Sequence, residues 1–553
     1  MSKKQTGNNF LVHGSILALA SVLVRFIGML YRIPMVNIIG QEGNGYYSTA
    51  YSVYTILLLL SSYSLPLAVS KMVSARISVR RWLETKRILT VAFTFAVIVG
   101  LIFAMITYFG ADWFCDKIMN SPMSAIPLRW MAPTVFIMTI LGVLRGFFQG
   151  MQTTIPTAVS QILEQIVNAL VSVGMAALLF QHGKEVNASL NAVGYEYSWG
   201  AAGGTIGTGA GALTALIFCF VVFFWYRPNF LKNVRRDRHP SVKSYGRLMR
   251  ILVSTAVPVI LSTACYNCID IIDTALFNAA MRSQGMAVRD YSAIWGNYNS
   301  AYLLLIHLPV AFSSAIASAL IPSLTQAFVK NDREEMMKKI SLTVSVTLLI
   351  AIPCAFALTV VGGNLAKLLF PSISEEAGKY LIVGSLAVVF FSVSTVTNAI
   401  LQGLDHMKKP VAHALTSLLI HVAILGLLLF VFKAGIYSVI VSYMIFGLVM
   451  SLLNLRSVYK ISGYLPHPVR NITVPAGASL VMTVVCFLIS LLFRHVGSTS
   501  VRNLLIIGCS LFFGALIYFV IVLLFGALSR SQIVELPAGR KILKIAEKLH
   551  LVR

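Results

Sequence analysis

Charged residues are scarce in this 553-residue sequence. They make up 11% of the chain, whereas hydrophobic residues make up 57%. A soluble domain carries about 25% charged residues, so the composition excludes an ordinary soluble enzyme or binding domain. It predicts an all-α polytopic membrane protein with most of its residues in lipid.

Acidic residues are rarer still. The chain has 19 Asp and Glu against 44 Lys and Arg, a net charge of +25. Such a charge could indicate nucleic-acid binding, but the basic residues lie in short clusters between apolar runs. The most basic loop, 227–250, is therefore expected to be a solvated linker, and no nucleic-acid partner is expected.

Motifs of enzyme chemistry are missing as well. The sequence contains no HExxH, no paired metal-ligand spacing, no nucleophile elbow and no nucleotide-binding motif. The longest outer loop, 181–199, is too short for a catalytic domain. These absences predict a protein that is not an enzyme and that holds no metal or organic cofactor.

Two further features predict packing instead of chemistry. The glycine-rich segment 200–211 lacks the strand, lysine and hydroxyl of a phosphate loop, so it predicts close helix contacts through small residues. His307, His413 and His421 are single histidines in apolar runs, which predicts hydrogen-bonded core residues more than proton carriers.

Apolar runs long enough to cross a bilayer are abundant. A span needs about 20 predominantly apolar residues. This criterion gives fourteen candidate spans, near 11–39, 48–70, 88–110, 130–150, 155–180, 200–226, 248–280, 295–328, 340–362, 380–403, 411–431, 434–456, 472–493 and 503–528.

Basic residues favour every second loop by roughly three to one, which predicts that both termini are cytoplasmic. The segment 540–553 alternates lysine and arginine with apolar residues. It predicts a basic amphipathic helix on the inner, anionic membrane surface.

The two halves of the chain resemble each other. Gln149-Gly150 is followed by Pro156, and Gln402-Gly403 is followed by Pro410. In each half, this pattern predicts a helix that ends at the Gln-Gly pair and a new helix that begins at the proline. Six spans in each half predict parallel repeats with a substrate site between them. The expected domains are a first lobe 1–226, a linker 227–247, a second lobe 248–458, two added spans 459–528 and a tail 529–553.

Five charged residues inside apolar runs form the candidate site. Arg25 and Arg32 are seven residues apart and share one helix face, and Asp270 and Asp273 are three apart and face one side. Glu164 is the remaining acid. Charge at membrane depth is expensive and usually functional. The alternatives are that the arginines snorkel to an interface, that an Arg–Asp pairing locks the lobes, and that Glu164 lies near the cytoplasmic end.

Three stretches resemble a known family. They are Ile39–Tyr47 (IGQEGNGYY), Ser64–Val73 (SLPLAVSKMV), and Leu308-Pro309 leading to Ala319–Leu324 (ALIPSL). They are similar to the group of stage V sporulation protein B and MurJ-type lipid II flippases, which belongs to the multidrug/oligosaccharidyl-lipid/polysaccharide (MOP) exporter superfamily. The similarity covers nearly the whole chain.

The resemblance implies a V-shaped, MATE-like bundle of two lobes with a cationic cavity for an undecaprenyl-diphosphate-linked sugar, and transport by alternating access. Arg25 matches an arginine of the first helix in the MurJ type, and Arg32 falls within one residue of another. The acid expected early in the second helix is absent from Gly45–Tyr51, and 297–307 lacks an expected arginine. Asp270 and Asp273 align with no MurJ residue, and a coupling role is expected for them.

The expected function is a flippase for a polyprenyl-diphosphate-linked cell-envelope precursor, with lipid II as the best single candidate. Arg25 and Arg32 would bind substrate, and Asp270, Asp273 and Glu164 would serve a coupling cation, Na⁺ or H⁺. The expected location is the bacterial cell membrane, with membrane lipid and cell-wall synthesis proteins as partners. The alternatives are a cation-coupled multidrug antiporter and a non-transporting scaffold or glycan enzyme.

Overall fold

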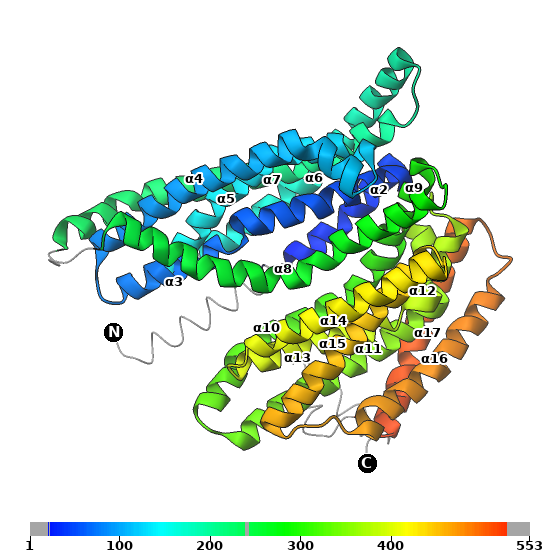
Figure 1. The fold of residues 1–553 in the computed structure, drawn as a ribbon. Helices are drawn as coiled ribbons and strands as arrows, with labels where there is room; N and C mark the ends of the chain where they lie inside the picture. Colours follow the sequence, from blue (N-terminus) through cyan, green and yellow to red (C-terminus); the bar gives the residue numbers. More distant parts are fainter. Residues whose placement is uncertain (1–19, 21–22, 238–242, 528–553) are drawn as a thin grey trace. The chain divides into compact units, whose positions relative to one another are not determined.

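The computed structural model describes residues 20, 23–237 and 243–527. Every regular element in these residues is a helix. By their contacts they divide into two compact units, Met1–Gly296 and Asn297–Arg553, and Figure 1 shows the helices of each. The predicted amphipathic helix 540–553 lies outside the described residues.

Unit 1 is built from long helices joined by short turns. Its elements are α2 (Arg32–Leu58), η1 (Leu59–Tyr63), α3 (Leu65–Ile77), α4 (Trp82–Trp113), η2 (Phe114–Ile118), η3 (Pro122–Ser124), α5 (Ala125–Gly150), α6 (Ile155–Leu190), α7 (Tyr195–Arg236), α8 (Tyr245–Ser283) and α9 (Val288–Asn297), whose last residue opens unit 2.

Unit 2 has the same character. Its elements are η4 (Tyr298–Leu303), α10 (Leu304–Val329), α11 (Arg333–Leu369), α12 (Glu375–Gly384), α13 (Ala387–Gly403), α14 (Lys408–Gly426), η5 (Leu427–Val431), α15 (Ile436–Ser462), η6 (Val469–Thr473), α16 (Val474–Leu492) and α17 (Thr499–Leu524).

The expectation of an all-helical polytopic protein is confirmed. Among the described residues, eleven helices are long and apolar enough to cross a membrane, or up to twelve if the bent pair Glu375–Gly384 and Ala387–Gly403 is one span. Fourteen spans were expected. Part of the first, 11–39, lies outside the described residues, namely 11–19 and 21–22. The seventh, 248–280, falls within the 39-residue helix α8.

The division by contacts differs from the division expected from the repeat. The boundary falls after Gly296 and not in the linker 227–247, because α8 packs against α2, α3 and α4 of unit 1. The six-helix lobes therefore stay a prediction of the repeat pattern.

Small residues set the tightest helix contacts of unit 1. A Cβ at Gly146 would lie 2.7 Å from the carbonyl oxygen of Pro66, and one at Gly150 would lie 2.6 Å from Cβ of Val73, so α5 meets α3 backbone to backbone. On α7, a Cβ at Gly207 would overlap Ser172 of α6. The packing role predicted for 200–211 is confirmed.

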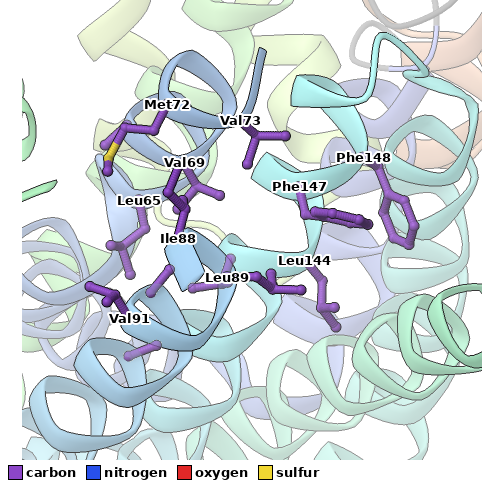
Figure 2. Close-up of a cluster of buried hydrophobic side chains, with 14 of the residues drawn as sticks. Leu65, Val69, Met72, Val73, Ile88, Leu89, Val91, Leu144, Phe147 and Phe148 are labelled. Carbon is purple, nitrogen blue, oxygen red and sulfur yellow. The ribbon is translucent and has the colours of Figure 1, made fainter. Parts of the chain in front are cut away.

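A hydrophobic core fills the space where α3, α4 and α5 meet. Figure 2 shows its side chains converging from these three helices. The labelled residues are Leu65, Val69, Met72, Val73, Ile88, Leu89, Val91, Leu144, Phe147 and Phe148, each at most 7% exposed.

The two units repeat one turn. After α5 ends at Gly150, Gln152 takes a φ of +63°, and after α13 ends at Gly403, Asp405 takes a φ of +61°. Arg80 (+58°) and Asn331 (+54°) are a second such pair, before α4 and α11. Left-handed conformations are uncommon outside glycine, so their recurrence two residues after Gln-Gly supports the internal repeat.

Candidate functional site

Arg25 and Arg32 lie on one continuous helical stretch. The Tyr31 N–H donates to the Ile27 carbonyl at 3.2 Å, and the Met35 N–H donates to the Tyr31 carbonyl at 3.2 Å, so helical hydrogen bonding runs through this point. Arg25 and Arg32, seven residues apart on this helix, therefore lie on the same helix face. Arg25 is exposed and Arg32 is partly buried.

Arg32 faces a wall of tyrosines. Its guanidinium carbon lies 5.9 Å from the centre of the Tyr47 ring, within cation–π range. Tyr47 stacks on Tyr51 with ring centroids 5.8 Å apart, and Tyr51 lies 5.6 Å from Tyr54. Tyr47 and Tyr51 come from Gly45–Tyr51, the segment where the resemblance leads one to expect an acid.

Asp270 and Asp273 come from α8, which packs against α2. Asp270 interacts electrostatically with both Arg32 and Asp273. The two carboxylates differ in exposure, however, since Asp270 is exposed and Asp273 is 2% exposed. The i, i+3 spacing predicts one shared side and could not predict this difference.

Glu164 belongs to a mostly buried ion pair. Arg145 Nη2 lies 2.7 Å from Glu164 Oε2, and Arg145 Nε donates to Ser160 Oγ at 3.0 Å. Glu164 also interacts electrostatically with Tyr51 and Tyr54. The structure thus brings Arg32, Glu164 and Asp270 around these tyrosines, whereas Asp273 interacts with Asp270.

Arg145 is a residue that the sequence reading missed. It lies inside α5, where it is 8% exposed. The available signal was its position inside the apolar run that ends at Gly150, five residues before the helix end.

A second missed contact joins α2 to α9. Arg289 Nε donates to Glu42 Oε2 at 2.6 Å, and the Tyr46 hydroxyl donates to Glu42 Oε1 at 3.0 Å. Asn44 Nδ2 donates to the Gly296 carbonyl at 2.8 Å. A Cβ on Gly296 would overlap the Gln41 carbonyl. The segment Gly40–Gly45 (GQEGNG) therefore supplies both the hydrogen bonds and the close backbone contact where α2 crosses α9.

Two of the three predicted core histidines lie in hydrogen-bond networks of unit 2. His413 Nδ1 lies 2.7 Å from Asn454 Oδ1, and its Nε2 lies 3.2 Å from Ser457 Oγ. His307 Nε2 lies 3.2 Å from the Tyr443 hydroxyl. The predicted hydrogen bonding is confirmed for both, but the predicted core position is wrong, since His307 is exposed and His413 is partly buried.

The described part of the chain contains no group of three or more His, Cys, Asp or Glu placed to hold a metal ion. What the cluster around Arg32 offers is one planar cation, aromatic faces and nearby carboxylates. Such a set can bind an anionic group through the guanidinium and stack a ring beside it.

Comparison with known proteins decides the family. Residues 11–328 match the model of the family described as "Polysaccharide biosynthesis protein". This chain belongs to that family. Residues 258–425 of this polysaccharide biosynthesis family member also match the MatE model.

Two curated relatives come from Bacillus subtilis (strain 168). This family member is 27% identical over 423 residues to "Lipid II flippase MurJ", covering 74% of each chain. It is 24% identical over 544 residues to "Stage V sporulation protein B", covering 98% of this chain and 100% of that protein.

Two solved structures share its fold. An inward-facing multidrug resistance MATE family transporter of the MOP superfamily matches with a TM-score of 0.66 at 14% identity, covering 81% of this chain and 98% of that one. Lipid II flippase MurJ in an inward closed conformation matches with a TM-score of 0.61 at 14% identity, covering 92% and 98%. This family member is therefore a multi-pass membrane protein that shares the fold of these two solved structures.

Proposed function

We propose that this chain is an alternating-access flippase that moves a polyprenyl-diphosphate-linked cell-envelope precursor from the inner to the outer leaflet, with lipid II as the best single candidate. The observation that carries the proposal is Arg32, held against Tyr47 on the helix that also presents Arg25. A guanidinium presents donors in a planar fork that matches a phosphate group.

The two arginines have different surroundings, which suggests different roles. Arg25 is exposed and is assigned the first contact with the diphosphate. Arg32 stands between the tyrosines and Asp270 and is assigned the inner contact. In the empty state Asp270 partly neutralises Arg32, and the diphosphate replaces that carboxylate when it binds.

The proposed energy source is the membrane potential. A diphosphate carries about two negative charges, and each charge moved outward from a negative interior gains about 2.3 kcal/mol per 100 mV. Asp270 and Asp273, with a bound Na⁺ or H⁺ or with Arg32 as partner, would neutralise the empty site as it returns.

The proposed location is the bacterial cell membrane, with both termini cytoplasmic. Contacts within unit 1 join segments predicted on the same side, which supports the predicted alternation of the loops, and the cytoplasmic assignment rests on the distribution of basic residues. At the inner end the Leu83 N–H donates to Asp237 Oδ2 at 2.8 Å, and at the outer end Arg282 Nη1 donates to Asn120 Oδ1 at 2.8 Å.

Reconstitution with fluorescent lipid II tests the proposal. Protein-containing vesicles should expose inner-leaflet lipid II to an external quencher or enzyme, and protein-free vesicles should not. Failure to expose lipid II together with efflux of a cationic dye would favour a cation-coupled multidrug antiporter. The match of 258–425 to the MatE model makes that the second candidate. If neither cargo moves, a scaffold role becomes the better account.

A further inference from the structure

A pocket opens on unit 1 where α5 ends and α6 begins, against the last turns of α7. Its volume is about 370 Å³, and it is lined by Phe147, Phe148, Met151, Thr153, Pro156, Val222, Trp225, Tyr226 and Asn229. That volume falls within the range of small-molecule sites, about 300–1,000 Å³. Phe147 and Phe148, which lie side by side in Figure 2, belong to its buried wall.

The α7 wall of the pocket changes character along the helix. Val222, Trp225, Tyr226 and Asn229 are spaced so that they share one face. Lys232 and Arg236 continue that face, within about 60° of Asn229, and lie about 4.5 and 10.5 Å farther along the axis. Both basic side chains are exposed.

Charge on this wall has one sign. From Tyr197 to Arg236 the chain has no acidic residue, and none of the residues that line the pocket is acidic. Trp225 is 86% exposed at the pocket mouth. An exposed tryptophan between an apolar surface and basic residues is typical of the membrane–water interface.

We propose that this pocket binds one anionic glycerophospholipid, with an acyl chain in the pocket and the phosphate at Lys232 and Arg236. The apolar lining suits the chain, and the two basic side chains suit the headgroup. The site lies at the end of unit 1 that is predicted to face the anionic inner leaflet. The bound lipid bridges the α5–α6 turn to α7, and its binding does not depend on the identity of the cargo.

Quenching of Trp225 tests the site directly. The full-length chain with the other tryptophans (82, 113, 130, 199 and 295) changed to Phe is reconstituted into phosphatidylcholine vesicles. A tenth of the lipid is then replaced by brominated phosphatidylglycerol or by brominated phosphatidylcholine. Selective binding predicts that phosphatidylglycerol quenches as though enriched about fivefold over its bulk fraction.

Matched charge variants separate a site from general surface attraction. Lys232→Gln with Arg236→Gln should reduce phosphatidylglycerol quenching to the phosphatidylcholine level. Arg227→Gln with Arg235→Gln removes the same amount of charge from other faces of α7 and should leave phosphatidylglycerol enriched near Trp225. The proposal is overturned if the two brominated lipids quench Trp225 equally. It is also overturned if both double variants lose phosphatidylglycerol quenching to the same extent.

A second measurement uses the chain with all its tryptophans. Protein purified in detergent from mixed vesicles should carry bound phosphatidylglycerol, counted by mass spectrometry, and the Lys232→Gln, Arg236→Gln variant should lose it. Thr153→Phe, which reduces the pocket volume, should lose bound lipid while both basic residues remain. Retention of the lipid in the basic-residue variant would also overturn the proposal.

Discussion

The Arg145 guanidinium lies 2.7 Å from the Glu164 carboxylate, and the two side chains are 10% and 16% exposed. Each charge is therefore neutralised by a neighbour from an adjacent helix. The pair connects α5 to α6 beside the tyrosines. A structural role of Glu164 in this pair and a role in ion coupling predict different results when Glu164 is changed.

Glu164→Gln should destabilise the protein, because it leaves Arg145 buried without its counter-charge. Breaking a buried pair costs about 3–5 kcal/mol, and the partial exposure here places the expected loss at about 2–3 kcal/mol. Thermal unfolding in detergent should show a lower melting temperature. Arg145→Met with Glu164→Gln should recover most of the loss. A Glu164→Gln protein with unchanged melting temperature but lost ion dependence would assign Glu164 to coupling.

Arg25→Ala should abolish lipid II flipping in vesicles, because the diphosphate loses its first bidentate partner. Arg25→Lys should retain partial activity, since an ammonium supplies charge without the planar fork. As a control, Arg227→Gln removes one positive charge from α7, outside the proposed substrate site, and should leave flipping unchanged. Full activity of Arg25→Ala would remove Arg25 from the mechanism.

Asp273→Asn should slow the return of the empty carrier without abolishing substrate binding. The buried carboxylate is assigned to neutralising the arginine face during that step. Single-turnover exposure of lipid II should then stay near normal while the multiple-turnover rate falls. Asp270→Asn is the matched comparison on the same helix, and unchanged turnover in both variants would argue against a resetting role.

Dissipating the membrane potential should stop flipping against a substrate gradient. Two charges crossing 100 mV correspond to about 4.6 kcal/mol, roughly a 2,000-fold bias in the equilibrium. The measurement is lipid II exposure in vesicles at a set potassium diffusion potential, with and without valinomycin. Uphill flipping at zero potential and zero ion gradient would rule out the scheme.

The α2–α9 crossing should depend more on its glycines than on its ion pair. Arg289 is 53% exposed, so Arg289→Gln should cost less than about 1 kcal/mol. Gly296→Ala inserts a Cβ into the Gln41 carbonyl and should cost about 1–3 kcal/mol. Hydrogen exchange of the α9 amides should speed up strongly in Gly296→Ala and slightly in Arg289→Gln. The reverse order would mean that the ion pair holds α9.

Hydropathy and glycine spacing predicted most of the fold, because both depend on local sequence. The helix ends at Gly150 and Gly403 are where the Gln-Gly pattern places them. The Arg145–Glu164 pair could not be read in this way, since it depends on the rotation of α5 against α6. The exposure difference between Asp270 and Asp273 likewise depends on which neighbour covers α8.

The packing of 248–280 also depends on more than the order of the spans. The repeat assigned 248–280 to the second lobe, yet α8 packs with α2, α3 and α4. Sequence order records which helices are connected. It does not record which of two packing surfaces a helix occupies when both are apolar.

Gln152 and Asp405 take the same left-handed backbone conformation at matching turns of the two units, so the two turns can be compared within one molecule. A non-glycine residue in this conformation costs roughly 1–2 kcal/mol relative to its usual backbone geometry. Replacing either by glycine relieves the same strain at two places in one molecule, at one temperature and in one detergent. Any difference between the two responses then measures how strongly the surroundings of each turn hold the left-handed conformation.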